Sequence, residues 1–186
     1  MSKPRLSQSD WIFAGFNALA ELGPVALKAE VLARRIGSSK GSFYWHFTDV
    51  PSFHAAMMAL WEQRAVTDVI DALAPLPDPR DRLRMLARLA QEKPTELDPN
   101  QPAESAIRAW ARAAQLVRDT VDRVDSRRLE YLEALLAEAG VPPRPYARLI
   151  YATLIGLDDL PSVQGQPSNA LVQLVNLILT QFPDPA

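Results

Sequence analysis

Residues 37–47 read Gly37-Ser38-Ser39-Lys40-Gly41-Ser42-Phe43-Tyr44-Trp45-His46-Phe47, and the rest of the chain is organised around this stretch. The pattern predicts a tight turn followed by one short helix. Gly37 can adopt the left-handed backbone that ends a preceding helix, and the Ser39 hydroxyl can cap the helix that follows. Phe43 and Phe47 are four residues apart, so they share the face that anchors this helix in a small core.

The polar side chains of the same stretch can then offer hydrogen-bond donors elsewhere on the helix. Lys40 falls in the first turn, where a cation opposes the helix dipole, so a phosphate or a base outside the protein explains it better than helix stability does. Tyr44 and His46 can donate to phosphate, which positions a protein without reading sequence. Trp45 can either reach a groove or lie on the domain surface. The residues that we expect to contact DNA are Ser39, Lys40, Ser42, Tyr44, Trp45 and His46.

These residues also carry a family resemblance. The stretch from Leu32 to Phe47, with Lys-Gly-Ser-Phe-Tyr-Trp-His-Phe at its end, resembles the DNA-binding signature of the TetR family of transcriptional regulators. The resemblance is strong over residues 7–62 and weaker in the body, where residues 106–111 and 125–129 are similar to one branch of the family. It implies a transcriptional regulator, expected to be a repressor, that binds double-stranded DNA as a homodimer and is released by a small-molecule effector.

One position departs from the family pattern. Relatives often have a lysine shortly after the histidine of the signature, where this chain has Val50 beside Asp49. A phosphate contact that is common in relatives is therefore expected to be missing. This departure, together with the modest charge described below, motivates an alternative from another class: a ligand-binding or partner-binding helical dimer that no longer reads DNA specifically.

Composition narrows the function further. The 186 residues carry a net charge of −2 and include no cysteine. Residues 1–64 hold seven basic and five acidic residues, so a mildly basic head precedes an acidic body, as expected if only the head meets phosphate. The absence of cysteine is compatible with the reducing cytosol, and no stretch is apolar enough to span a membrane, so we expect a cytoplasmic protein.

An enzyme is not expected. The two histidines, His46 and His54, both lie in the head, and we expect neither to form a metal site or a catalytic dyad. The adjacent pair Asp158 and Asp159 points in successive helical directions and makes a poor metal clamp. No glycine-rich phosphate loop is present. We therefore expect no catalytic residue, no metal and no cofactor.

The apolar periodicity and the capping signals predict an all-α chain of about nine helices. Ser7 and Asp49 are N-cap candidates, Pro51 and Pro79 lie at first-turn positions, and Gly140 is a stop signal. The expected helices cover about 8–22, 27–36, 40–47, 50–73, 79–90, 103–113, 116–139, 144–157 and 168–182, with a loop at 94–102. We expect residues 1–48 to form a helix-turn-helix DNA-binding domain, and residues 49–186 to form a helical effector-binding and dimerisation domain.

The last two predicted helices are apolar almost all round, whereas a surface helix needs only an apolar stripe. Either they are central to the body or they meet another chain, and we favour the second reading, which agrees with the four-helix dimer interface that the resemblance implies. The expected interface residues are Leu154, Leu157, Leu171, Leu174, Val175 and Ile178. Large aromatic residues of the body, with ordinary core packing as the alternative, are candidates for an effector pocket: Trp61, Trp110, Tyr131 and Tyr151.

Overall fold

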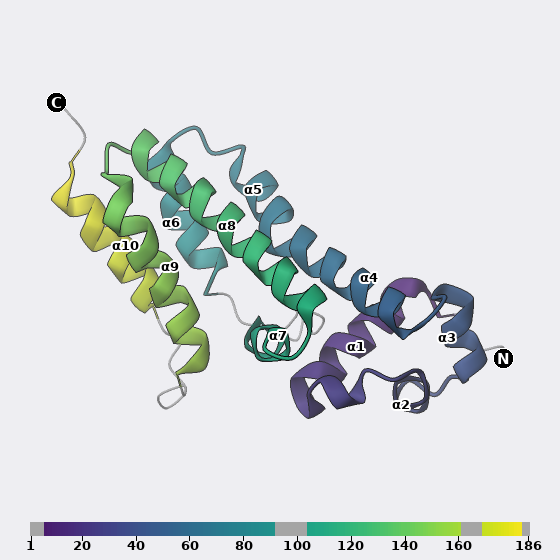
Figure 1. Ribbon diagram of the computed structural model, residues 1–186. Coiled ribbons are helices and arrows are strands. Elements are labelled where there is room, and N and C mark those ends of the chain that lie inside the picture. The colour runs from purple at the N-terminus through teal and green to yellow at the C-terminus, as the bar shows by residue number, and fades with distance from the viewer. Residues whose placement is uncertain (1–5, 92–103, 161–168, 184–186) are drawn as a thin grey trace. The chain divides into compact units, whose positions relative to one another are not determined.

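The computed structural model describes residues 6–91, 104–160 and 169–183. Within these ranges the chain is helical and contains no β-strand, which confirms the predicted fold class (Figure 1). The elements in chain order are α1 (Gln8–Leu22), η1 (Pro24–Ala26), α2 (Ala29–Arg35), α3 (Lys40–His46), α4 (Val50–Glu62), η2 (Gln63–Thr67), α5 (Asp68–Leu73), α6 (Pro79–Leu89), α7 (Glu104–Ala111), α8 (Gln115–Glu138), α9 (Pro143–Asp159) and α10 (Ala170–Gln181).

The chain divides into two compact units. Unit 1 is drawn from residues 1–63 and 94–121, and unit 2 from residues 64–93 and 122–186. The division between a DNA-binding domain at 1–48 and a body at 49–186 is one of function, and it stays a prediction. None of the helices in the described ranges is both long and apolar enough to cross a lipid bilayer.

Helices α1 and α4 of unit 1 begin where their capping residues predict. Ser7 and Asp10 form a capping box at the start of α1, and Asp49 forms another with Ser52 at the start of α4. Helix α1 packs against α2, α4 and α7. Gly15 lets α1 approach α4 closely, because a Cβ atom built on it would lie 2.6 Å from Cζ of Phe53.

The predicted single helix over residues 50–73 is wrong in one respect. The α-helix α4 ends at Glu62, the π-helical segment η2 follows it, and the α-helix α5 then begins at Asp68. A π turn widens the backbone ring and takes its carbonyl groups out of the regular ladder, and such turns are frequent at functional sites. Side chains of α8 bind this segment, as described below. The 3.6-residue apolar pattern runs through η2 and so could not reveal it.

The core of unit 2 is built from α6, α8, α9 and α10. Asp78 caps α6, Pro79 lies in its first turn as predicted, and Gly140, with φ of +73°, follows the end of α8. Helix α10 packs against both α6 and α9. The buried side chains of this core are Leu83, Ala87, Leu132, Leu135, Leu136, Ala139, Val141, Ala147, Ile150, Tyr151, Leu171, Val175, Ile178 and Leu179.

Several boundaries differ from expectation by a few residues. The helix predicted at 27–36 is shorter in the structure, where α2 covers Ala29–Arg35, because Leu27 and Lys28 have non-helical backbone angles. The 3₁₀ turn η1 precedes it and was not predicted. Arg144 at the start of α9 is also non-helical, with φ of −100° and ψ of 129°. The predicted loop at 94–102 lies outside the described residues, and so do the first residues of two predicted helices, Ala103 and Ser168.

Candidate nucleic-acid interface

The turn between α2 and α3 has the geometry that its residues predict. Gly37 adopts φ of +64°, a left-handed conformation that suits glycine. The amide of Ser38 donates to the carbonyl oxygen of Ala33 at 2.8 Å, which closes the end of α2. Ser39 then caps α3, because its Oγ accepts a hydrogen bond from the amide of Ser42 at 3.1 Å.

An aromatic cluster holds α3 in place. Phe43 is fully buried and Phe47 nearly so, which confirms them as the anchors of this helix. The Phe43 ring lies edge-on to Trp11 of α1, with 5.4 Å between ring centres, and 5.2 Å from the ring of Phe53 in α4. Edge-to-face packing of this kind adds to the stability gained from burial. Apolar contacts therefore fix the short helix α3 against α1 and α4.

The remaining side chains of α3 face outwards to different degrees. Trp45 is 78% exposed and Tyr44 is 45% exposed, which is unusual for aromatic residues of this size. Lys40 and Ser39 are exposed, whereas Ser42 and His46 are half-buried. All six residues expected to contact DNA therefore lie on or directly before α3, and Trp45 takes the surface position that the sequence left open. Their contact with DNA stays a prediction.

Two ion pairs of the head were not predicted from the sequence. Lys40 of α3 pairs with Glu30 of α2, and Arg35 of α2 pairs with Glu21 of α1. The hydrogen bond from Lys40 to Glu30 lowers the pKa of the Glu30 carboxyl and raises the pKa of the Lys40 ammonium. Both groups therefore stay charged at neutral pH. Neither pair follows a helical spacing within one element, so the partners come together only in the folded head.

Two of the proposed pocket residues belong to unit 1 and are buried. Trp61 of α4 is 2% exposed and Trp110 of α7 is 5% exposed. The ring of Trp110 lies edge-on to His54 of α4, with 4.9 Å between ring centres. His54 Nε2 lies 3.4 Å from the carbonyl oxygen of Leu27, and burial lowers the pKa of this histidine. His54 thus connects α4 with α7 and with the residue that follows η1.

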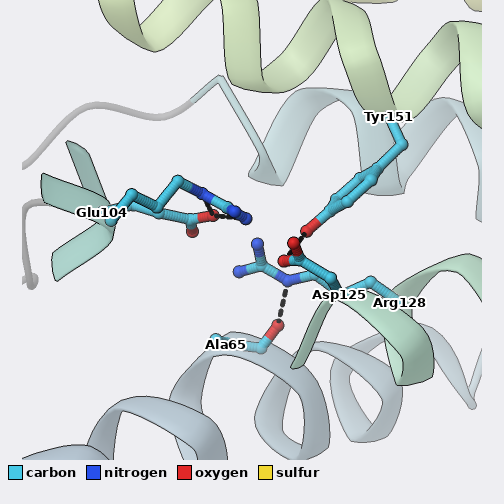
Figure 2. A network of polar contacts seen from close by, with 6 residues as sticks. Ala65, Glu104, Asp125, Arg128 and Tyr151 are labelled. Atoms are coloured by element: carbon cyan, nitrogen blue, oxygen red, sulfur yellow. Dashed lines mark hydrogen bonds and ion pairs between the residues drawn. The ribbon is translucent and has the colours of Figure 1, made fainter. Parts of the chain in front are cut away.

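The other two pocket residues belong to unit 2. Tyr131 is half-buried on α8, and burial raises its pKa. Tyr151 of α9 is buried, and its hydroxyl donates a hydrogen bond of 2.7 Å to the Asp125 carboxylate of α8 (Figure 2). Burial raises the pKa of Tyr151 to about 12, and the hydrogen bond to Asp125 acts in the same direction.

Arg128 extends this polar network to the π-helical segment. Its Nε donates to the carbonyl oxygen of Ala65 at 3.0 Å (Figure 2), and the neighbouring Arg127 donates to Thr67 Oγ1 at 3.4 Å. Arg128 also acts on the Tyr151 hydroxyl and partly offsets the rise in its pKa. In the sequence, residues 125–129 were notable only for their family resemblance, and no role was predicted for Asp125 or Arg128.

Figure 2 also includes Glu104 of α7, which belongs to unit 1. This carboxylate accepts hydrogen bonds from Nε and Nη2 of Arg108, at 3.1 and 2.7 Å. The two residues are one helical turn apart on α7, and both side chains are about four-fifths buried. A buried ion pair of this kind needs its full set of hydrogen bonds to offset the loss of hydration.

The six residues expected at the dimer interface separate into two groups. Leu171, Val175 and Ile178 are buried in the core of unit 2. The others pack against that core and are only partly buried: Leu154, Leu157 and Leu174. Two leucines of the same helices that are not among the six are more exposed, with Leu149 at 47% and Leu177 at 61%. Their role in an interface stays a prediction.

The turn, the anchored helix and its exposed polar face define a helix-turn-helix protein. No protein-family profile and no curated protein sequence matches the chain. Solved structures match its fold over most of its length. A protein from Saccharomonospora viridis, designated a transcriptional regulator and solved in complex with choline, has a TM-score of 0.74 at 15% identity, covering 93% of this chain and 95% of that one.

Two further solved structures have a similar fold, and the second is named as a member of the TetR/AcrR family. SmeT, the repressor of the Stenotrophomonas maltophilia multidrug efflux pump SmeDEF, has a TM-score of 0.69 at 18% identity and covers 96% of this chain and 91% of its own. A regulator of the TetR/AcrR family from Thermobifida fusca has a TM-score of 0.63 at 18% identity, with coverages of 95% and 98%. The chain therefore has the fold of TetR-family transcriptional regulators, and at these identities the likeness is one of fold.

Proposed function

We propose that the chain is a DNA-binding transcriptional regulator of the TetR type, acting in the cytoplasm as a repressor. The observation that carries this proposal is the exposed face of α3. An aromatic core holds the helix by Phe43 and Phe47, while Lys40, Tyr44 and Trp45 face outwards. Exposed aromatic and cationic side chains on a rigid helix suit contact with the backbone and base edges of DNA.

We further propose that the chain binds DNA as a homodimer through α9 and α10. Leu149 and Gly156 of α9 and Leu177 of α10 are exposed in the single chain. Glycine within a helix costs about 1 kcal/mol relative to alanine, and a Cβ atom at Gly156 would meet nothing within 4 Å. A second helix that approaches closely would explain a glycine at this position. Leu154, Leu157 and Leu174 would lie at the edge of this interface.

Release by a small molecule is the third part of the proposal. The neighbour from Saccharomonospora viridis was solved with choline, so this fold can hold a small ligand. In this chain, unit 1 and unit 2 each offer a separate candidate for the effector site: Trp110 in unit 1, and Tyr151 with the polar network around Asp125 in unit 2. An effector that binds the DNA-free state better by about 1–3 kcal/mol would lower operator affinity by about 5- to 150-fold.

The test of DNA binding is selection of bound fragments from a random DNA pool, followed by footprinting. We expect enrichment of a roughly palindromic site whose halves are about one helical turn apart, or a multiple of it. Lys40→Ala, Tyr44→Phe and His46→Ala should each bind this site more weakly. If no sequence is enriched, while light scattering still finds a dimer, the alternative of a ligand-binding or partner-binding dimer takes its place.

The test of effector binding is a screen of small compounds for those that raise the melting temperature, since a ligand bound to the folded state stabilises it. Hits that also release the selected operator are effectors. Trp110→Phe and Tyr151→Phe are mild changes that should alter the shift produced by these hits. An unchanged shift for every hit in both variants would exclude the two residues from the site.

A further inference from the structure

The Lys40 ammonium is held by two partners on the surface of the head. It forms the ion pair with Glu30 of α2, and it also lies 5.9 Å from the centre of the Tyr44 ring, within the range of a cation–π contact. About half of each side chain in the ion pair is exposed, at 53% for Lys40 and 56% for Glu30. A cation and a carboxylate therefore stand side by side on the surface that is proposed to meet DNA.

This pairing makes phosphate a poor partner for Lys40. A phosphate that reaches the ammonium also brings its negative charge close to the Glu30 carboxylate, and like charges at such distances repel each other. The carboxylate can accept hydrogen bonds but cannot donate them. A favourable ligand for the pair must therefore offer acceptors to Lys40 and, beside them, a donor to Glu30.

The edge of a G·C base pair in the major groove has this arrangement. Guanine presents the acceptors O6 and N7, which lysine can bind, and cytosine presents the N4 amino group, which a glutamate can accept. Guanine O6 and cytosine N4 are hydrogen bonded to each other across the base pair, so an ion-paired lysine and glutamate can span the same edge. An A·T pair also places an acceptor beside a donor, at N7 and N6 of adenine, but its donor separates its two acceptors, so one ammonium cannot bind two neighbouring acceptors as it can on guanine. The A·T pair also adds the thymine methyl group, which is a poor neighbour for two charges.

We propose that Lys40 and Glu30 together read one G·C base pair in each half of the operator. Lys40 binds O6 and N7 of the guanine, and Glu30 accepts a hydrogen bond from N4 of the cytosine. The ring of Tyr44 holds the ammonium in place. This inference rests on the proposed function, since it requires that the head binds DNA, and it assigns Glu30 as a specificity-determining residue.

The experiment compares the full-length protein with Glu30→Gln and Glu30→Ala by selection from random DNA. The parent should prefer G·C at one position of each half-site by about 5- to 150-fold, as expected for one good base contact. Glu30→Ala should weaken the preference at that position alone. Glu30→Gln should move it toward A·T, because glutamine pairs well with N6 and N7 of adenine. Since Glu30 is exposed, both variants should fold, and circular dichroism checks this.

Glu21→Gln is the matched control. Glu21 also pairs with a cation of α2, Arg35, so the variant removes the same charge and an equivalent ion pair without touching α3. Its selected site should equal that of the parent. Salt dependence adds an independent measurement: Lys40→Ala should leave the slope of log affinity against log salt nearly unchanged, whereas loss of a phosphate contact would reduce it by about 0.9.

The outcomes separate the inference from the proposed function. If the parent enriches no sequence, the proposed function itself fails. If the parent enriches a site, and both Glu30 variants select the same site with higher affinity while Lys40→Ala flattens the salt slope, then Lys40 binds phosphate and the inference is overturned. If the Glu30 variants and Glu21→Gln weaken the preference for G·C to the same extent, the effect comes from the change in net charge, and the inference is overturned as well.

Discussion

Arg80 of α6 donates a hydrogen bond of 2.6 Å from Nη2 to the carbonyl oxygen of Leu179, near the end of α10. The same guanidinium donates to the carbonyl oxygens of Phe182 at 2.8 Å and of Ala139 at 3.2 Å, although the side chain is almost fully buried. The last carbonyl groups of a helix have no partner within the helix. Arg80 therefore satisfies the ends of α8 and α10 at once.

Replacement of Arg80 should lower the stability of unit 2. Hydrogen bonds to a charged group contribute about 1.5–3 kcal/mol, and buried carbonyl groups that lose them bear a desolvation cost, so Arg80→Met should reduce the free energy of unfolding by about 2–4 kcal/mol. Arg80→Lys keeps the positive charge but lacks the planar guanidinium, so its free energy of unfolding should lie between those of the parent and of Arg80→Met. Urea unfolding followed by circular dichroism measures both. A loss below about 0.5 kcal/mol for Arg80→Met would contradict this role, since that is the range of ordinary surface changes.

Gly15→Ala should destabilise the head. The added Cβ atom would lie 2.6 Å from Phe53 Cζ and 2.9 Å from Met57 Sδ, and both of these side chains are fully buried and cannot move aside freely. Overpacking of this kind costs about 1–3 kcal/mol. Gly41→Ala is the control, because its nearest contact would be Ser39 Oγ at an ordinary 3.7 Å. Equal melting temperatures for the two variants would show that α1 and α4 separate easily.

The caps, the left-handed glycine and the aromatic anchors were predictable because each depends on neighbours in the sequence. Ser7, Ser39 and Asp49 each cap a helix through a hydrogen bond to a backbone amide three residues further on, and Phe43 needs only an apolar surface to pack against. The turn at Gly37 follows from a conformation that few other residues tolerate. Local physics of this kind acts before any tertiary contact forms.

The long-range partners were not predictable in this way. Asp125 and Tyr151 are 26 residues apart, Arg80 and Leu179 are 99 apart, and no local pattern pairs them. The apolar character of α10 is equally ambiguous: it shows that one face is buried but does not show that Ile178 turns inwards and Leu177 outwards. Packing against α6 and α9 makes that choice.

Tyr151 should make stability depend on pH in the alkaline range. Its pKa rises from the ordinary value of 10 to about 12 in the folded chain, so folding favours the neutral phenol. The stabilisation is fully present below pH 10 and is lost as the pH rises from 10 to 12, by about 3 kcal/mol in total. Urea unfolding at pH 8–11 should show a steeper loss for the parent than for Tyr151→Phe. Parallel curves for the two proteins would show that Tyr151 ionises as readily as an exposed tyrosine.

His54 should make stability depend on pH in the acidic range, where stability is lost as the pH falls. Burial lowers its pKa in the folded chain, so the proton binds the unfolded chain better. The stabilisation is present above the unfolded pKa of about 6.5 and is lost as the pH falls through the lower folded value. His54→Gln should therefore be relatively more stable at pH 5 than at pH 7.5, compared with the parent, by urea unfolding followed by tryptophan fluorescence. A constant difference between the proteins across this range would exclude titration of His54.

The proposed dimer can be tested at a residue whose replacement leaves the core intact. Leu177 is 61% exposed on α10, so Leu177→Glu should fold normally as a single chain. A two-fold interface brings the same residue in from both chains, so one substitution places two charges there. We expect light scattering to find a dimer for the parent and a monomer for Leu177→Glu, with an unchanged circular dichroism spectrum. Operator affinity should then fall, because a single head makes too few contacts.

Two further variants show which part of this expectation is specific to the interface. Leu22→Glu places the same charge on another exposed leucine, at the end of α1, and should remain dimeric. Ile178→Glu places it on a buried neighbour of Leu177 and should unfold unit 2, because an unpaired charge in a core is strongly destabilising. If the parent is monomeric and protects one unpaired half-site, or if Leu177→Glu is still dimeric, the exposed faces of α9 and α10 are not where two copies meet.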